Sequence, residues 1–404
     1  MRHVLGVGAC VASALLVVAC GGTTDTGASS TAGATSSQPP APVIVSADQL
    51  DPGKYPTKPR PPLGTAGNPG TGVRLDAQRM ADYVVGPWDV DDTLVTPYLE
   101  SFYVLDTPGV LSRLGSEQVT AAAGRNSFVN GFASAREATD KAAMLHAVLR
   151  FADPAAATAA SIDMNKAASE RPIAGVTPTV AVIPGHPEAA ASTYPFSSPT
   201  GSGAVRATIR SFTPHGPYVF MEFVQSVDGF DAAAALVAKV IDEQGPVIDE
   251  FKPAELSAFG SVEIDPTGLL ARTLPLASGS PADNAVYTAR GAAHFQSNPS
   301  GSEVLFKDTG VTEVAMADTN VYAAKDAATA GMVIKSFNDE LSTMEGTTIS
   351  APVPNLPDSH CFAFPKAFYC VAPADRYAIE ANGEKLDDLH QKVAAQYVML
   401  TAKS

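Results

Sequence analysis

The cysteines are the residues of this 404-residue chain whose surroundings most clearly indicate chemistry. Cys20 ends the tetrapeptide Val17–Cys20, which closes an apolar run that begins at Val4 behind Arg2. A basic start, an apolar stretch shorter than the ~20 residues of a membrane-spanning helix, and small residues before the cut are typical of a secretory signal. The tetrapeptide fits a bacterial lipobox, which predicts cleavage before Cys20 and lipidation of its sulfur, with palmitate among the acyl chains. A plain signal peptide and an N-terminal anchor helix are the alternatives.

The remaining cysteines indicate a disulfide. Cys10 leaves with the predicted signal, so that Cys361 and Cys370 are an even pair in an oxidising compartment. They flank an eight-residue aromatic segment, which predicts a bridge that closes a short turn. A metal site made with His360 is the rival interpretation, but it lacks a fourth ligand at any standard spacing. We therefore expect no metal.

The histidines outside the predicted signal do not form a recognisable ligand set. A catalytic histidine needs an oriented partner, and the spacing of these residues supplies none. His146 alternates with apolar residues and is expected to be a half-exposed strand residue, and His215 lies in a turn between two prolines. The six residues are His146, His186, His215, His294, His360 and His390.

Strong catalytic signatures are absent from the sequence. It contains no Gly-x-Ser-x-Gly nucleophile elbow, no phosphate loop ending in Gly-Lys-Ser/Thr, no His-Glu-x-x-His and no dinucleotide-binding glycine pattern. We therefore expect a protein that is not an enzyme and binds no cofactor. A hydrolase with a scattered site is the alternative, because such sites are recognised by geometry alone.

The segment of residues 79–92 holds the densest group of unusual side chains, including Tyr83 and the only tryptophan, Trp88. Its acids could bind a cation such as calcium, but they lack the spacing and glycine of a calcium loop. In a second interpretation, Trp88 and Tyr83 pin this segment onto the core. In a third, they bind a ligand, since both residue types are enriched at recognition sites.

A repeated local pattern must position these residues. An apolar strand is followed by an acidic residue at the expected helix N-cap, and then by an alanine-rich helix. The strands are expected at 143–151, 218–224 and 314–322, and their helices end near residues 168, 243 and 344. The segments 151–159 and 322–330 are similar enough to suggest duplication, with convergence on capped alanine-rich helices as the alternative.

Strand pairs joined by tight loops, such as 205–212 and 218–224, indicate antiparallel pairing. We expect an α+β protein of two domains, each an antiparallel sheet with helices packed on one face. The expected organisation is a signal peptide at 1–19, a lipidated Cys20 with a disordered Gly/Ser/Thr/Pro tether at 20–46, an N-terminal domain at 47–276 and a C-terminal domain at 282–404.

The charge of the chain excludes some partners. Its formal net charge is −15 at pH 7, and loss of Arg2 with the predicted signal makes it one unit more negative. An acidic body argues against binding to nucleic acid and against lying flat on anionic lipid. Contact with the membrane is therefore expected only through the N-terminal lipid.

Four segments carry a resemblance to a known family. Residues 51–57, 79–89, 151–159 and 390–397 are similar to an actinobacterial lipoprotein family of mycobacteria, nocardiae and rhodococci. The family consists of an N-terminal and a C-terminal domain of unknown function. The resemblance implies an extracytoplasmic location at the outer face of the cytoplasmic membrane, and it implies no activity and no catalytic residues. The cysteine pair fits the C-terminal pattern of this family.

The expected function is that of a lipid-anchored envelope protein that binds a partner, either an apolar envelope lipid or a cell-wall protein. We expect the site between the two domains, near Tyr83, Trp88 and the loop at His215, because ligand pockets tend to form at domain junctions.

Overall fold

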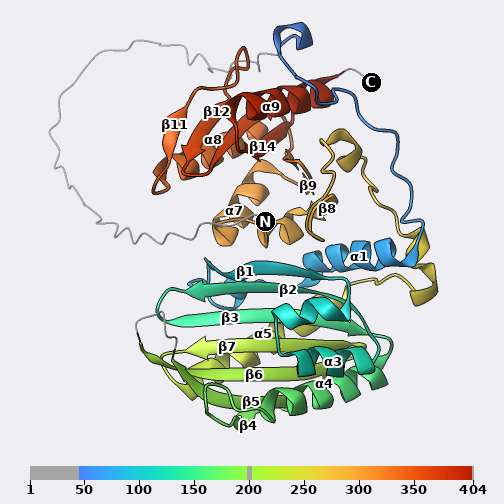
Figure 1. The fold of residues 1–404 in the computed structure, drawn as a ribbon, viewed down its shortest axis with the longest axis vertical. Coiled ribbons are helices and arrows are strands. Elements are labelled where there is room, and N and C mark those ends of the chain that lie inside the picture. Colours follow the sequence, from blue (N-terminus) through green and yellow to red (C-terminus); the bar gives the residue numbers. More distant parts are fainter. Residues whose placement is uncertain (1–44, 198–202, 403–404) are drawn as a thin grey trace, which may run out of the picture.

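Two seven-stranded antiparallel sheets organise the computed structural model, which describes residues 45–197 and 203–402 (Figure 1). Cys20 and the segment up to residue 44 lie outside the described residues. The principal elements up to residue 249 are α1 Pro69–Met80, α2 Pro87–Val90, β1 Thr96–Leu105, α3 Glu117–Arg125, β2 Phe128–Ala138, β3 Ala142–Phe151, α4 Pro154–Ser169, β4 Thr179–Ile183, β5 His186–Ser197, β6 Val205–His215, β7 Tyr218–Ser226 and α5 Phe230–Asp249. The later elements are β8 Ala285–Thr288, α6 Ala289–Ala293, α7 Pro299–Thr309, β9 Glu313–Met316, β10 Thr319–Ala323, α8 Ala327–Thr343, β11 Thr348–Ser350, β12 His360–Phe364, β13 Ala367–Ala374, β14 Tyr377–Gly383 and α9 Leu386–Thr401.

The two sheets have the same topology. The first has the strand order β1-β2-β3-β7-β6-β5-β4, and the second, read from its other edge, has the order β8-β9-β10-β14-β13-β12-β11. In each, three strands are followed by a helix, four further strands and a final helix. We call residues 96–249 the first repeat and residues 285–401 the second repeat. The two-domain α+β prediction is confirmed.

The similar segments 151–159 and 322–330 occupy the same place in this topology. The first joins β3 to α4, and the second joins β10 to α8. Asp153 accepts a hydrogen bond from the Ala156 N–H at 2.8 Å, and Asp326 accepts one from the Thr329 N–H at 2.9 Å. Both are helix N-caps, as expected. The shared strand order supports the duplication that the two segments suggest.

The third expected acidic cap is wrong. Helix α5 begins after Gly229, whose φ of 94° favours glycine and whose lack of a side chain leaves the helix without a side-chain cap. Asp231 lies in the first turn instead, where its charge still favours the helix dipole.

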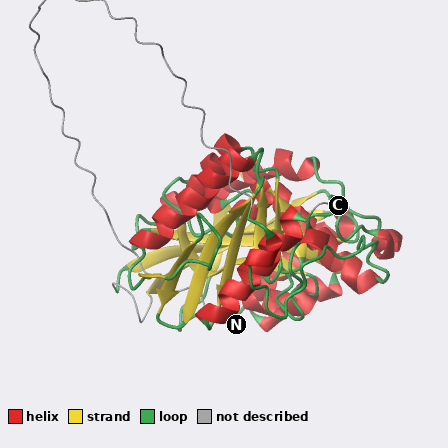
Figure 2. Ribbon diagram, turned by 90° about the horizontal axis from the view of Figure 1, so that it is seen from above, coloured by secondary structure: helices red, strands yellow, loops and turns green. Residues whose placement is uncertain are grey.

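Helices cover both faces of each sheet, not the single face expected from the sequence (Figure 2). In the first repeat, Leu145 and Leu149 of β3 lie in a buried cluster with α4, whereas Met144 and Val148 lie in a cluster with α5. The reason is that β3 is buried at every position from 143 to 151. In the second repeat, α8 and α9 cover opposite faces in the same way.

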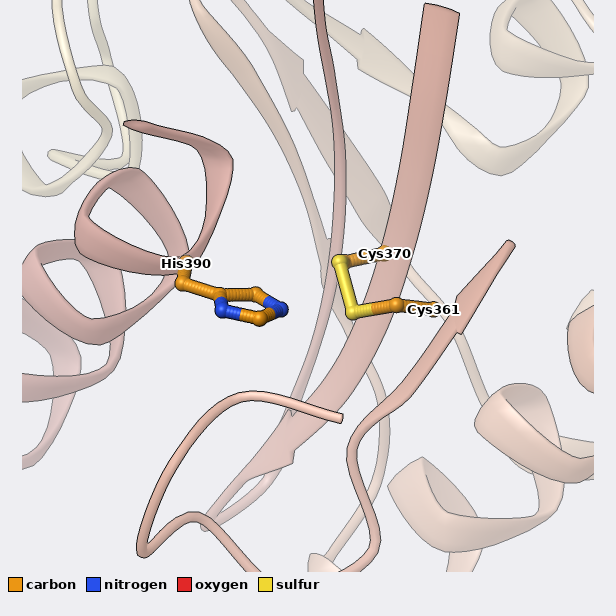
Figure 3. A group of neighbouring side chains, drawn as sticks. All are labelled: Cys361, Cys370 and His390. Atoms are coloured by element: carbon orange, nitrogen blue, oxygen red, sulfur yellow. A yellow bond between two sulfur atoms is a disulfide. The ribbon is translucent and has the colours of Figure 1, made fainter. Parts of the chain in front are cut away.

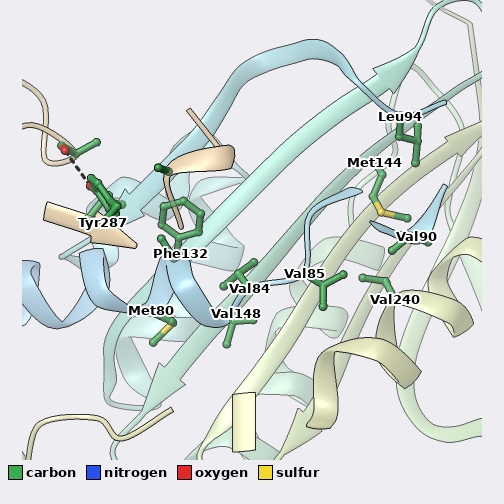
Figure 4. Packing of buried hydrophobic residues seen from close by; sticks show 14 of the residues in the cluster. Met80, Val84, Val85, Val90, Leu94, Phe132, Met144, Val148, Val240 and Tyr287 are labelled. Atoms are coloured by element: carbon green, nitrogen blue, oxygen red, sulfur yellow. Dashed lines mark hydrogen bonds between the residues drawn. The ribbon is translucent and has the colours of Figure 1, made fainter. Parts of the chain in front are cut away.

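One continuous apolar core joins the repeats. It contains Met80 and Val84 from the segment before β1, Phe132 from β2 and Tyr287 from β8 (Figure 4). Phe295, just after α6, links the two sides, because its ring centroid lies 4.5 Å from that of Tyr287 and 6.1 Å from that of Phe132. The junction is therefore packed with side chains of both repeats.

Candidate functional site

A cavity of about 460 Å³, which we call the junction cavity, lies between the second repeat and two segments outside the repeats, α1 with the 3-10 helix that follows it and the connection 263–267. Its walls come from α1, the 3-10 helix Ala81–Tyr83 that follows it, the segment 263–267 and the first two strands of the second repeat. The apolar lining residues are Leu75, Ile264, Pro266, Val286 and Tyr287. The charged and hydrogen-bonding lining residues are Gln78, Arg79, Asp82, Glu263, Thr267, Thr288, Thr312 and Glu313.

Asp82 connects the segment before β1 to the second repeat at the edge of this cavity. The N–H and the hydroxyl of Thr288 both donate to its Oδ1, at 3.2 Å and 2.8 Å. Thr288 is the N-cap of α6, so the carboxylate lies at the positive end of that helix. Gly291 permits the close approach, since a Cβ at this position would lie 2.1 Å from Asp82 Oδ1.

Burial raises the pKa of Asp82 to about 6, although hydrogen bonds from Thr288 and Gly291 and the charge of Arg79 lower it. The folded protein therefore holds the Asp82 proton more tightly than the unfolded chain does. This contribution favours folding fully below about pH 4, the usual pKa of an aspartate, and is lost as the pH rises through about 6.

The substitution Asp82→Asn removes this titration. The quantity to compare is the free energy of unfolding of the wild type minus that of the variant. We expect this difference to fall by about 1–3 kcal/mol between about pH 4 and about pH 7. Urea unfolding at both pH values measures the difference. Asp92→Asn, which changes an exposed carboxylate, should follow the wild type. Identical pH profiles for Asp82→Asn and the wild type would contradict the expectation.

The C-terminal end of α6 is held by the first repeat. Arg136 of β2 is only 1% exposed, and its Nη2 donates to the carbonyls of His294 and Gln296, both at 2.9 Å. Burial lowers the pKa of Arg136 to about 10. Asp82 holds the N-terminal end of α6 on the segment before β1, and Arg136 holds its C-terminal end on the first repeat. Both charges complement the dipole of α6.

The sequence-predicted residues Tyr83, Trp88 and His215 line neither this cavity nor a smaller one of about 100 Å³ beside α3. Tyr83 directly follows Asp82, and its ring packs on Phe251 with centroids 5.1 Å apart. Trp88 is 5% exposed and packs on His294 at 5.1 Å.

His215 ends β6 and lies away from the cavity. It forms a 2.8 Å contact with Asp249 and stacks on Phe220. The structure thus brings Tyr83 close to the cavity, and it places Trp88 and His215 in other surroundings. A ligand site formed by these three residues stays a prediction.

The prediction that His146 is half-exposed is wrong, because its side chain is completely buried. Its Nδ1 lies 3.0 Å from both carboxylate oxygens of Glu222, and its Nε2 lies 2.7 Å from Gln244 Oε1. That oxygen also accepts from the Val85 N–H, so the His146 Nε2 must donate. Burial lowers the pKa of His146, but the charge and hydrogen bond of Glu222 outweigh it and the pKa is raised.

The His146 cluster ties β3, β7 and α5 to the segment before β1, because Gln244 Nε2 also donates to the Tyr83 carbonyl at 2.8 Å. Neither cavity is lined by its members. Its role is structural.

Asp76 of α1 is a second buried centre of polar contacts. Its carboxylate accepts hydrogen bonds from Arg150 at 2.9 Å, from Asn130 at 3.1 Å and from the Ala254 N–H at 2.9 Å. Arg79 contributes a further contact at 3.2 Å. These bonds fix α1, which forms one wall of the cavity, on β2 and β3.

The segment 79–92, singled out from the sequence, contributes Arg79 and Asp82 to the cavity. Thr288 and Glu313 come from the second repeat, more than two hundred residues away. No local spacing in the sequence indicates that these residues lie close together in the fold.

Comparison with known families decides the relationship of the chain. Residues 63–264 match the family described as "Domain of unknown function (DUF7373) N-terminal", and residues 269–403 match "Domain of unknown function (DUF7373) C-terminal". The chain belongs to the DUF7373 family. This confirms the expected pairing of an N-terminal and a C-terminal domain of unknown function.

Other comparisons with this DUF7373 protein add little. A solved structure, "Crystal structure of the extracellular domain of PknH from Mycobacterium tuberculosis", is 13% identical, with a TM-score of 0.28. The match covers 45% of this chain and 99% of that chain, and at this score it carries no argument. No match was found among the curated proteins.

The predicted disulfide is present in the DUF7373 C-terminal region. Cys361 of β12 and Cys370 of β13 are directly opposite each other, with their Cα atoms 4.1 Å apart. They pack in a cluster with Leu389 and Val393 of α9, as expected for a turn locked against the terminal helix.

His390 of α9, and not His360, points toward the two sulfurs (Figure 3). A ligand atom of each of the three side chains lies within 4.8 Å of the others. Sulfurs bonded to each other offer no thiolate to a metal ion, so this group is described here as a disulfide beside an imidazole. The His390 Nε2 lies 3.0 Å from the Ala351 carbonyl.

Removal of the disulfide should lower stability. For the double variant Cys361→Ser, Cys370→Ser we expect a loss of about 2–3 kcal/mol in the free energy of unfolding, because a short loop is released. Denaturant unfolding with and without a reductant measures it. The wild type should lose the same amount on reduction, and the double variant should not respond. A variant as stable as the oxidised wild type would contradict the prediction.

Among the described residues, we find no helix with the length and apolar character needed to cross a membrane.

Proposed function

We propose that this DUF7373 protein is a lipid-anchored, extracytoplasmic binding module that holds a mostly apolar ligand in the junction cavity. The observation that carries the proposal is the cavity itself. Its volume of about 460 Å³ falls within the range of small-molecule sites. Apolar side chains of α1, the segment 263–267 and the second repeat line it together with several polar groups. The lipobox at Val17–Cys20 supports the anchor. Binding requires no catalytic group.

The hydrolase alternative gains no support from the pair of Ser134 and His294. Their side chains lie 3.0 Å apart, but both are buried, and neither lines the cavity. Burial lowers the pKa of His294 to about 3, which makes its imidazole a weak base.

Ligand binding is tested with a cavity-filling variant. Thr267 is exposed and lines the cavity, so Thr267→Trp should obstruct it with little effect on folding. Thr158→Trp changes an exposed threonine of α4 that does not line the cavity. The fluorescent apolar probe N-phenyl-1-naphthylamine should bind the wild type and Thr158→Trp, and envelope lipid extract should displace it.

Thr267→Trp should bind the probe about tenfold more weakly or worse. Equal binding by both variants would place the probe elsewhere and count against the cavity. Mass spectrometry of lipids that co-purify with the membrane-extracted protein would identify the natural ligand.

The anchor has its own test. Cys20→Ala should leave the protein unlipidated, because the acceptor sulfur is missing. In a detergent phase separation, the wild type should enter the detergent phase and the variant should stay in the aqueous phase. A variant that enters the detergent phase although its signal has been removed would refute lipidation of Cys20.

A further inference from the structure

The charges that line the junction cavity are unbalanced. Asp82 comes from the 3-10 helix after α1, Glu263 from the connection after α5 and Glu313 from the start of β9. Glu263 and Glu313 form no ion pair with any of the residues in 45–197 and 203–402. Three acidic residues from three elements thus line one cavity.

The only basic residue in the described lining, Arg79, is engaged elsewhere. Its Nη1 donates to Asp76 at 3.2 Å, its Nη2 donates to the Lys252 carbonyl at 3.2 Å, and its guanidinium lies 5.7 Å from the centre of the Phe251 ring. Arg79 is near enough to lower the pKa of Asp82, but it does not neutralise the other two acids.

The rest of the cavity wall is suited to a hydrocarbon chain. Leu75, Ile264 and Val286 present aliphatic side chains. Tyr287 also lines the cavity, although it is only 1% exposed, and its hydroxyl donates to the Ala282 carbonyl at 2.8 Å. Covering these side chains with a ligand removes apolar surface from water, which is favourable.

We propose that the cavity selects an amphiphile with a positively charged amine, whose chain covers the apolar wall and whose amine lies among Asp82, Glu263 and Glu313. A carboxylate that loses water must gain a charged or hydrogen-bonding partner, and an ammonium group supplies both. A sulfate or phosphate head would meet three like charges. This inference rests on the proposed function and specifies the class of ligand.

Four probes separate the head from the chain. Dodecylammonium, dodecanol and dodecyl sulfate share one chain, and butylammonium keeps the amine with a short chain. In calorimetric titrations below the micellar range, dodecylammonium should bind about tenfold more tightly than dodecanol, as expected for one charge-assisted contact. Dodecyl sulfate should bind more weakly than dodecanol, and butylammonium should not bind measurably.

The acidic surface of the whole protein requires a matched control. Glu313→Gln removes one charge from the cavity, and Glu345→Gln removes one from an exposed site outside its lining. We expect Glu313→Gln to reduce the preference for dodecylammonium over dodecanol about three- to tenfold, and Glu345→Gln to leave it unchanged. Equal effects of the two substitutions would assign the preference to general surface charge and overturn the inference.

The outcomes also distinguish this inference from the proposed function. If none of the three dodecyl probes binds, the proposed binding function fails. If all three bind equally, the binding function stands and the selection of an amine is refuted. Binding of butylammonium as tight as that of dodecylammonium would indicate a site for a small free amine and would refute the amphiphile.

Discussion

Replacement of Glu222 by alanine should lower the free energy of unfolding by about 3–5 kcal/mol, because it leaves the buried His146 without its charged partner. Both side chains are completely buried, and the His146 Nδ1 contacts both carboxylate oxygens at 3.0 Å. The substitution should weaken the buried cluster that holds β3, β7 and α5 together. Urea unfolding followed by circular dichroism measures the change.

The surface of the protein offers a control with the same chemistry. Glu188 contacts His186 at 3.1 Å, but its side chain is 46% exposed. Glu188→Ala should therefore cost less than about 1 kcal/mol. Replacing both His146 and Glu222 by leucine should cost less than Glu222→Ala alone, since no buried charge is left unpaired. A double variant that is less stable than Glu222→Ala would show that the charges themselves stabilise the fold.

The substitution Asp76→Ala should have an effect of similar size, about 3–5 kcal/mol. It leaves the guanidinium of Arg150, a residue only 7% exposed, without its carboxylate, and it removes the acceptor of Asn130 and of the Ala254 N–H. Asp76→Asn should cause a smaller loss of stability, because the side-chain amide oxygen still accepts hydrogen bonds. Calorimetric and urea unfolding measure both variants.

Asp339→Ala serves as the control for Asp76→Ala, because this aspartate pairs with Lys335 on the exposed surface of α8. Its cost should be much smaller than that of Asp76→Ala, because exposed ion pairs contribute little to stability. Asp76→Ala should also weaken binding of the apolar probe, since α1 forms a wall of the cavity. Equal stability losses for the two variants would contradict the assigned role of Asp76.

The local pattern of the sequence was sufficient to predict much of the fold. The strand and helix at 143–168 and those at 314–344 were recognisable, because strand alternation and an aspartate N-cap are properties of neighbouring residues. The burial of β3 on both faces was not recognisable from the sequence, because polar side chains such as those of His146 and Arg150 are typical of an exposed strand face. Each is buried beside an acid from another element, because His146 contacts Glu222 and Arg150 donates to Asp76.

The candidate site was less accessible to sequence analysis. Thr288 lies 206 residues from Asp82, and in the structural cluster Glu222 lies 76 residues from His146. Such pairs are created by the packing of the repeats, and no spacing in the sequence encodes them. The cysteine pair was predictable, because two cysteines in one short segment have one intramolecular pairing.

The two repeats meet through parts that are not equivalent in their shared topology. The first contributes β2 and the face covered by α5, whereas the second contributes β8, at the position of β1, and helix α6, which follows it. A junction between equivalent faces would relate the repeats by a twofold axis and would create every surface twice. The cavity is lined by the second repeat together with α1, Asp82 and the segment 263–267, and this combination occurs once in the part of the chain that the structure describes. The stoichiometry of binding at this cavity should therefore be one ligand per chain, even though the chain carries two copies of the same topology.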